Sequence, residues 1–435
     1  MTETDIIIIG AGPGGMDTAA AACASGKNVV LIEKGSIGGT CLNRGCIPTK
    51  ALARTAQIAI DAKEAGDFGL GIQDINVDFR RVMERKDEVV TTLREGAVMG
   101  LKGVRIVEAE AEFIGKNTVL AANEEFTAPM IIIATGSAPS KIPIPGAEYA
   151  IDSDSFLETK ELPARVTIIG GGVIGIEFAS ILNALGCEVT VVEFCKEILP
   201  PFDKDIAKRL RMSLNKRGVK ILTSSSVTEI KQDHTVVYES KGKIAEVESD
   251  TVIMAVGRRA IIPEGLDKAG IEVGKRGITV NENYETTVPG IYAIGDVNAQ
   301  CMLAHAAAAQ GKKVLGEDID MNVVPAAVFS VPECSMVGLT EEQCKDQGLD
   351  YKSIKVPFRS NGKAVAMGES DGLLKLITEN ATGKILGVHI CGPHAADLIS
   401  EPALVMANGL TKENITRTIH SHPTLGEILA SAVTR

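Results

Sequence analysis

A predicted strand, a glycine-rich loop and a predicted helix follow one another at the start of the chain. The apolar residues of Asp5–Gly10 predict a short buried strand. Glycines 10, 12 and 15 then open a helix of small residues over Met16–Ser25, and a second strand is predicted at Asn28–Glu33. One such pattern is weak support for a binding site, because glycine-rich turns also serve packing.

The same pattern returns further along the chain. It comprises a strand over Val166–Gly170, glycines 170, 172 and 175, a helix over Ile176–Leu185 and a strand over Glu188–Glu193. The first glycines (10 and 170) and the closing glutamates (33 and 193) are both 160 residues apart. The chain therefore contains an internal repeat, and two copies are hard to attribute to chance.

The repeated pattern has a physical interpretation in dinucleotide binding. Glycines let the backbone approach a diphosphate at a helix N-terminus, where the helix dipole and free N–H groups favour an anion. The closing acid, Glu33 or Glu193, then accepts hydrogen bonds from ribose hydroxyls. We therefore predict two adenine dinucleotides, each in its own doubly wound domain. The alternative for each glutamate is a solvated carboxylate at a strand end.

Further elements are predicted between and after the repeats. Helices are expected at Cys46–Lys63 and Phe79–Lys102, the second with a heavily charged face. Short strands are then expected up to and including Met130–Thr135. Two later segments, Thr251–Gly257 and Ile291–Asp296, each run from an apolar strand into glycine.

The pattern changes from about residue 325, where strands alternate with two helices. The expected elements are strands Lys352–Pro357, Leu373–Thr378 and Lys384–Ile390, and helices Ala395–Ala407 and Gly426–Val433. They indicate a third domain of α+β type without a dinucleotide motif.

Composition narrows the class of protein. With 435 residues the chain suggests about three domains, and 45% hydrophobic with 23% charged residues is typical of a globular protein. No apolar run approaches the length of a membrane span and no signal peptide is visible, so we expect a cytoplasmic protein. The net charge of −11 argues against nucleic acid or an anionic membrane as partner.

Two of the nine cysteines stand apart from the others. Seven are scattered, as expected for reduced thiols in a reducing compartment, whereas Cys41 and Cys46 are close neighbours flanked by glycines. A regular helix would rise roughly 7.5 Å between them, beyond the ~7 Å between Cα atoms that a disulfide spans. A bond therefore needs an irregular stretch, which Gly39 and Gly45 permit.

Three interpretations of this cysteine pair are open. The first is a redox-active pair: Pro48 suits the first turn of a helix that begins near Cys46, where the helix dipole would stabilise a reactive thiolate. A structural zinc half-site would need a second pair of ligands, and the other cysteines lie singly. Two inert thiols are the third interpretation. The residues favour a redox pair.

Several segments together carry a family resemblance. They are GAGPGG at 10–15, GGTCLNRGCIPTK at 38–50, GGGVIGIE at 170–177, TTVPGIYAIGDV at 286–297, MLAHAAAAQG at 302–311 and HPTLGE at 422–427. In this order they resemble the flavin-dependent disulfide reductases of the class I pyridine nucleotide–disulfide oxidoreductase family. The resemblance implies an α/β fold with two Rossmann-like FAD- and NAD(P)-binding domains and a C-terminal α+β dimerisation domain. The implied domains are 1–143 for FAD, 144–262 for NAD, 263–324 for a central domain that completes the FAD site, and 325–435 for the interface.

The resemblance also implies the cofactor sites. The residues expected to bind FAD, one per subunit and non-covalently, are Gly10, Gly12, Gly15, Glu33, Lys50, Ala111, Thr135, Gly136, Ser137, Asp296 and Ala304. Those expected around NAD are Gly170, Gly172, Gly175, Glu177, Glu193, Val227 and Gly257. Lys50 is expected near the flavin with Glu177 as its partner.

The catalytic residues implied by the resemblance are Cys41, Cys46, His422 and Glu427. His422 is the expected base for a substrate dithiol, with Glu427 orienting its imidazole. Cys41 is the expected thiol that exchanges with substrate, and Cys46 the thiolate nearer the flavin. In the family the histidine comes from the partner subunit, so a homodimer is implied.

Cofactor and substrate choice follow from the same comparison. Glu193 stands where an NADP enzyme would need arginine, which favours NAD. Within the family this points to reoxidation of dihydrolipoyl groups, carried by a lipoyl-bearing protein of a 2-oxo acid dehydrogenase or glycine cleavage complex. A flavin- and NAD-binding scaffold without turnover is the alternative, but it would lack the cysteine pair or His422. No metal is expected, although His389, Cys391 and His394 resemble a ligand cluster.

Overall fold

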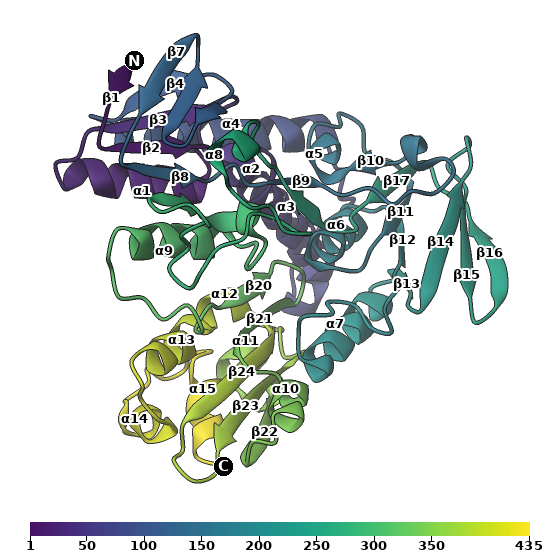
Figure 1. The fold of residues 1–435 in the computed structure, drawn as a ribbon. Helices are drawn as coiled ribbons and strands as arrows, with labels where there is room; N and C mark the ends of the chain where they lie inside the picture. The colour runs from purple at the N-terminus through teal and green to yellow at the C-terminus, as the bar shows by residue number, and fades with distance from the viewer. The chain divides into compact units, whose positions relative to one another are not determined.

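The computed structural model describes residues 1–435 (Figure 1). Its contacts divide the chain into two compact units. The first unit comprises Met1–Ala51, Arg80–Ser140 and Gly257–Met321. The second comprises Leu52–Phe79, Lys141–Val256 and Asn322–Arg435. No helix has the length and apolar character needed to cross a bilayer.

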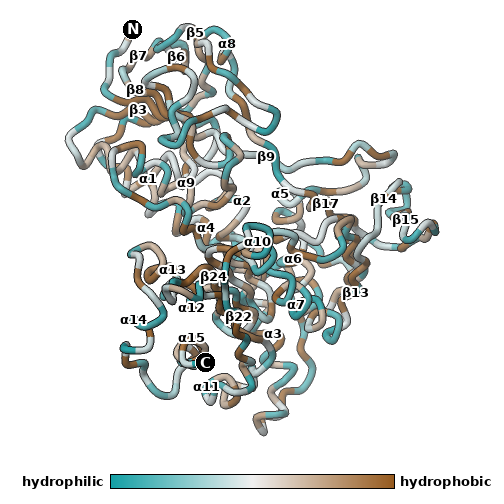
Figure 2. The backbone as a smooth tube through the Cα atoms, turned by 60° about the horizontal axis from the view of Figure 1, so that its bottom comes forward, coloured by the Kyte–Doolittle hydropathy of each residue, from teal (hydrophilic) through white to brown (hydrophobic).

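A five-stranded parallel sheet forms the centre of the first unit. Its order is β19 (Ile291–Ala293), β8 (Met130–Ile133), β2 (Ile6–Ile9), β3 (Val29–Glu33) and β4 (Arg105–Glu108). All residues of β2 are buried, as expected for a central strand covered on both faces. Figure 2 colours β3 and β8 as mainly hydrophobic strands.

Helices and small sheets complete the first unit. Helix α1 (Pro13–Ala24) follows β2, and α9 (Ala304–Val314) packs along α1 through small residues. The other helical elements are α2 (Gly39–Arg44), the first residues of α3 (Cys46–Glu64), α4 (Phe79–Gly100), α8 (Leu266–Ala269) and the 3₁₀ turn η3 (Gly295–Asn298). The other strands are β1 (Thr2–Glu3), β5 (Glu112–Gly115), β6 (Thr118–Ala121), β7 (Glu124–Thr127), β9 (Ser137–Pro139) and β18 (Arg258–Ala260), of which β9 and β18 pair with each other.

A second five-stranded parallel sheet lies in the second unit. Its order is β10 (Ile151–Asp152), β17 (Thr251–Met254), β11 (Arg165–Ile169), β12 (Glu188–Val192) and β13 (Lys220–Leu222). The helical elements of this region are α5 (Ser153–Phe156), α6 (Val173–Ala184), α7 (Lys204–Lys216), η1 (Ala65–Phe68) and η2 (Ala147–Tyr149). A three-stranded antiparallel sheet adds β14 (Ser225–Ile230), β15 (Val236–Ser240) and β16 (Lys243–Val247).

The C-terminal part of the second unit is built on an antiparallel sheet. Its order is β20 (Ala326–Val328), β21 (Glu333–Gly338), β24 (Ile385–Gly392), β23 (Leu373–Glu379) and β22 (Tyr351–Pro357). The surrounding helical elements are α10 (Glu341–Asp346), η4 (Phe358–Ser360), α11 (Gly362–Ala366), α12 (Ala395–Leu398), α13 (Ser400–Ala407), α14 (Lys412–Arg417) and α15 (Glu427–Val433).

Most predicted elements are present, with three differences. Both helices after the glycine loops begin three residues earlier than predicted, at Pro13 and Val173. The helix predicted over Ala395–Ala407 is two short helices, α12 and α13. Pro402 explains the break, because it lacks the N–H that would bond to the carbonyl of Leu398.

Candidate active site and cofactor-binding loops

The first glycine loop joins β2 to α1 and requires glycine at two positions. Gly10 has φ +104°, and a Cβ there would lie 2.3 Å from the Ala134 carbonyl oxygen. A Cβ on Gly15 would lie 1.9 Å from the Gly10 carbonyl oxygen. At Gly12, by contrast, a Cβ would meet nothing within 4 Å. The loop is thus closely packed on its protein side and open at Gly12, which suits a bound diphosphate.

Glu33 at the end of β3 is directed back to this loop. Its Oε2 accepts a hydrogen bond from the Ala11 N–H at 2.6 Å, and its Oε1 accepts one from the Gly35 N–H at 2.7 Å. The carboxylate is half-buried rather than fully solvated. It therefore lies beside the open loop, where a ribose hydroxyl would be expected.

The second glycine loop, between β11 and α6, repeats this geometry. Gly170 has φ +106°, a Cβ on Gly175 would lie 2.0 Å from the Gly170 carbonyl oxygen, and a Cβ on Gly172 would meet nothing within 4 Å. Glu193 Oε2 accepts from the Gly171 N–H at 2.5 Å. Both loops therefore fit an adenine dinucleotide by the same criteria.

The redox segment is attached directly to the first loop. The Gly38 N–H donates to the Ala11 carbonyl at 2.8 Å. Gly39 has φ +54°, and a Cβ on it would lie 2.7 Å from the Cα of Gly12. Only glycine allows the chain to approach the loop this closely, so helix α2 with Cys41 begins beside the predicted diphosphate site.

Cys41 and Cys46 lie on different helices, in agreement with the irregular stretch predicted between them. Gly45 (φ −147°, ψ −107°) ends α2, and α3 begins at Cys46. Both residues are thiols in the structure and are not joined in a disulfide. A hydrogen bond to Cys46 and burial raise the pKa of the Cys41 thiol, while the charge of Lys50 opposes this shift. The shift favours the protonated form of Cys41.

Four further predicted FAD residues lie around β9 and η3 in the first unit. The Thr135 hydroxyl donates to the Ile261 carbonyl at 2.6 Å, and the buried Ser137 hydroxyl donates to Asp296 Oδ2 at 2.5 Å. Gly136 has φ +73° and open space at its Cβ position. Ser137 and Asp296 are distant in sequence, and the fold brings them into contact.

Ala111 and Ala304 contribute no polar side-chain group. Ala111 is buried in the core after β4, and Ala304 is the first residue of α9. Any contribution from these alanines to a cofactor site is restricted to backbone atoms and shape.

The remaining residues predicted around NAD have different surroundings. Glu177 is buried in α6, and its Oε1 accepts from the Phe329 N–H at 2.9 Å. The side chain of Val227 packs in the hydrophobic cluster with Ile169 and Val192. Gly257 has φ +112° and open space at its Cβ position. The pairing of Glu177 with Lys50 stays a prediction.

His422 and Glu427 are in contact at the start of α15. His422 Nδ1 lies 2.9 Å from Glu427 Oε1, and the Thr424 N–H donates to Glu427 Oε2 at 2.8 Å. The hydrogen bond from the Thr424 N–H, and to a smaller extent the one with His422, lowers the pKa of Glu427. The His422 side chain is 80% exposed, so its Nε2 can contact a group of another molecule.

Three supporting residues were not predicted from the sequence. The Asn361 side-chain amide donates to the Thr424 carbonyl at 3.0 Å and so fixes the loop that carries His422. Arg258 contacts Ser137, and Gln310 contacts the backbone beside Asp296. Two of them had some signal in the sequence. Arg258 directly follows the predicted site residue Gly257, and Gln310 lies within the 302–311 segment that carries the family resemblance.

His389, Cys391 and His394, which resemble a ligand cluster in the sequence, are not grouped as metal ligands in the structure. His389 is buried, its Nε2 lies 2.9 Å from the Leu339 carbonyl oxygen, and burial lowers its pKa. No group of three His, Cys, Asp or Glu side chains is arranged to hold a metal ion.

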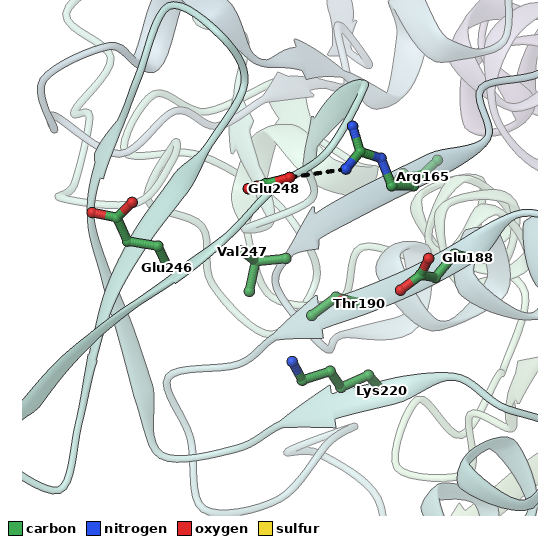
Figure 3. Close-up of a pocket in the computed structure, with 8 residues that line it drawn as sticks. Arg165, Glu188, Thr190, Lys220, Glu246, Val247 and Glu248 are labelled. Carbon is green, nitrogen blue, oxygen red and sulfur yellow. Dashed lines mark hydrogen bonds and ion pairs between the residues drawn. The ribbon is translucent and has the colours of Figure 1, made fainter.

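A cavity of about 380 Å³ lies where strands β11, β12 and β13 begin (Figure 3). Arg165, Glu188 and Lys220, the first residues of these strands, contribute to its lining, and Arg165 pairs with Glu248 at 3.1 Å. Dinucleotides bind at the carboxyl ends of such strands, so this cavity is not the predicted NAD site.

Comparisons with known proteins agree with this geometry. Residues 4–311 match the pyridine nucleotide-disulphide oxidoreductase family, and residues 324–433 match the dimerisation domain of that family. Dihydrolipoyl dehydrogenase of Bacillus subtilis is 41% identical, over 99% of this chain and 96% of that protein. The enzyme of the same name from Geobacillus stearothermophilus is 40% identical, over 99% of this chain and 95% of that protein.

A solved structure extends the likeness to three dimensions. A HOCl-induced flavoprotein disulfide reductase from Escherichia coli matches with a TM-score of 0.87 and 31% identity, over 99% of each chain. Its Cu(II) complex matches with a TM-score of 0.88. Family, sequence and fold therefore agree, and the chain belongs to the pyridine nucleotide-disulphide oxidoreductase family.

Proposed function

We propose that this protein is a dihydrolipoyl dehydrogenase, which reoxidises protein-bound dihydrolipoyl groups with NAD⁺ through the Cys41–Cys46 pair and FAD. The single observation that carries the proposal is the attachment of the cysteine segment to the first dinucleotide loop, through Gly38 and Gly39. The relatives of that name, about 40% identical over nearly the whole chain, support the choice of substrate.

The chemistry of the thiols begins with a proton transfer. His422 takes a proton from the substrate dithiol, and Glu427, whose carboxylate stays ionised, stabilises the imidazolium that results. The substrate thiolate attacks Cys41 of the oxidised pair, and the Cys41–Cys46 bond breaks so that Cys46 leaves as a thiolate. The second substrate thiol then displaces Cys41 and closes the lipoyl disulfide.

The geometry of the reduced pair fits these roles. The hydrogen bond to Cys46 and burial raise the pKa of the Cys41 thiol, which favours its protonated form. Cys46 is the residue proposed to be nearer the cofactor. FAD, when bound, supplies a two-electron carrier between this dithiol and NAD⁺.

Each cofactor has a set of residues that would hold it. For FAD these are the loop of Gly10, Gly12 and Gly15 with Glu33, together with Lys50, Ser137 and Asp296. For NAD they are the loop of Gly170, Gly172 and Gly175 with Glu193. Glu193 is 6% exposed and both of its carboxylate oxygens accept backbone hydrogen bonds. A 2′-phosphate beside this buried carboxylate would be repelled, which favours NAD over NADP.

We further propose that the active unit is a homodimer in the cytoplasm, with His422 of each subunit serving the Cys41 of its partner. The dimerisation domain matched at residues 324–433 and the 80% exposed His422 side chain support this arrangement. The lipoyl group would arrive on a protein of a 2-oxo acid dehydrogenase or glycine cleavage complex.

The deciding experiment is a comparison of two reactions by the purified protein loaded with FAD. We expect NAD⁺ reduction with dihydrolipoamide and at least a hundredfold slower oxidation of NADPH with glutathione disulfide. Faster turnover of glutathione disulfide with NADPH would overturn the proposal. Mixing His422→Gln with Cys41→Ser subunits tests the dimer, because a mixed dimer retains one intact site and should regain turnover.

A further inference from the structure

Only one of the two carboxylate oxygens of Asp296 accepts a hydrogen bond from the protein. Asp296 lies in η3, and its Oδ2 accepts a hydrogen bond from the Ser137 hydroxyl at 2.5 Å. Its other carboxylate oxygen, Oδ1, makes no hydrogen bond within the protein. A half-buried carboxylate with one fixed and one vacant acceptor is suited to bind a hydroxyl group of a ligand.

Arg258 holds the serine that makes this contact. Its Nε donates to the Ser137 hydroxyl at 2.8 Å, and one of its terminal nitrogens donates to the Ser137 carbonyl at 2.7 Å. The two strands that carry these residues, β18 and β9, are antiparallel partners, with Arg258 opposite Pro139 and Ala260 opposite Ser137. The guanidinium therefore directs the hydroxyl proton of Ser137 to Asp296, since the hydroxyl oxygen already accepts from Arg258.

The backbone beside Asp296 is fixed separately. The Oε1 of Gln310, which is 1% exposed in α9, accepts from the Gly295 N–H at 2.7 Å and from the Asn298 side-chain amide at 2.9 Å. These bonds hold both ends of η3. The hydrogen bond from Ser137 then restricts rotation of the Asp296 side chain.

We propose that Arg258 is a positioning residue for FAD, which acts through Ser137 to hold the Asp296 carboxylate ready for a hydroxyl of the cofactor. The inference rests on the proposed FAD site. Arginine suits this role because its planar fork presents two donors at a fixed spacing, which the single ammonium of lysine does not. Arg258 itself is not proposed to contact the reacting atoms.

The test measures the release of FAD from the loaded protein on dilution, by the rise of flavin fluorescence. We expect Arg258→Ala to weaken FAD binding about tenfold, as loss of a charge-assisted pair of hydrogen bonds predicts. Arg259→Ala is the matched control: Arg259 lies next on the same strand, is exposed, and should leave FAD binding unchanged. Arg258→Lys should rescue binding in part.

A double-mutant cycle identifies the route of the effect. If Arg258 acts through Ser137, Ser137→Ala and the double variant Ser137→Ala with Arg258→Ala should show the same FAD affinity within about twofold. Additive losses, or unchanged FAD affinity in Arg258→Ala, would overturn the inference. A wild-type protein that binds no FAD would instead overturn the proposed function, so the two failures are distinguishable.

Discussion

The two dinucleotide loops have nearly the same local geometry but differ in what the fold attaches to them. Gly10 and Gly170 share φ values of +104° and +106°, and the chain returns to each loop by an equivalent backbone bond: Gly38 N–H to the Ala11 carbonyl, and Leu199 N–H to the Gly171 carbonyl. After Gly38 the first copy continues into the cysteine helix. After Leu199 the second copy continues toward α7 without a redox group.

The contacts of the helices in the two copies also differ. In the first copy, α9 packs against α1 so closely that a Cβ on Gly311 would lie 1.8 Å from the Thr18 hydroxyl. In the second copy, Asp203 caps α7 and pairs with the buried Lys375 of β23 at 2.8 Å. The first copy is joined to α9 by close packing of small residues, and α7 of the second copy is joined to β23 by a buried ion pair. The repeat thus fixes the shape of the loop, and the segments attached to it differ.

The largest effect is expected at the redox segment, which only the first copy carries. Cys41→Ser and Cys46→Ser should each lower dihydrolipoamide turnover on the order of a thousandfold, because neither leaves a disulfide that can exchange. Both variants should retain FAD and bind NAD, since neither thiol belongs to a glycine loop. Dihydrolipoamide-dependent NAD⁺ reduction measures turnover, and flavin absorbance measures FAD content. Turnover within tenfold of wild type would contradict the assignment.

The next effect concerns the ionic support of the second copy. Lys375 is 2% exposed and binds Asp203, Asp205 and Glu341, and these hydrogen bonds raise its pKa against the effect of burial. Lys375→Met should lower the free energy of unfolding by about 3–5 kcal/mol, because it leaves the buried Asp203 carboxylate without a counter-charge. Urea unfolding followed by circular dichroism measures the change.

Lys355→Met is the matched control for this prediction. Lys355 pairs with Asp205 at 2.7 Å but is 49% exposed, so its loss should cost at most about 1 kcal/mol. Equal effects of the two variants would show that burial does not distinguish these ion pairs.

The third effect lies outside both copies and separates thiol chemistry from nucleotide binding. Glu427→Gln should lower turnover with dihydrolipoamide by roughly 10- to 100-fold, because the imidazolium of His422 loses its counter-charge. FAD content and NAD affinity should not change.

The pH dependence of the Glu427 contribution has a defined sign. The lowered pKa keeps the carboxylate ionised at and above the ordinary value of 4.5, and its contribution is lost only as the pH falls through the lowered value. A wild-type advantage over Glu427→Gln that already disappears between pH 7 and 5 would contradict this.

The smallest effect compares equivalent positions in the two loops. Gly12→Ala and Gly172→Ala should both fold normally, because a Cβ at either position meets no protein atom within 4 Å. Each methyl group would enter the space expected for a diphosphate. We expect about tenfold weaker FAD binding in Gly12→Ala with KM for NAD⁺ unchanged, and about tenfold higher KM for NAD⁺ in Gly172→Ala with FAD unchanged. A crossed result would reverse the cofactor assignment.

Local sequence was sufficient where a few neighbouring residues decide the conformation. The two glycine loops, the strands β2 and β11, and the helix start at Cys46 all follow from short apolar runs and the positions of glycine and proline. His422 and Glu427 are only five residues apart, but their contact was predicted from the family resemblance, because this spacing alone is a weak signal. The break between α12 and α13 was equally readable from Pro402, and the predicted continuous helix was wrong.

Contacts between distant segments could only be decided by the tertiary structure. Arg258 and Asp296 meet Ser137 across 121 and 159 residues of chain, and Lys375 meets Asp203 across 172. No periodicity links such residues, because their proximity depends on sheet order and on the pairing of β9 with β18. The sequence by itself determined the local elements and, with the family resemblance, predicted which residues bind and react. The fold decided which of them are held, and from which side, because hydrogen bonds and burial depend on neighbours that the chain brings together only when it is packed.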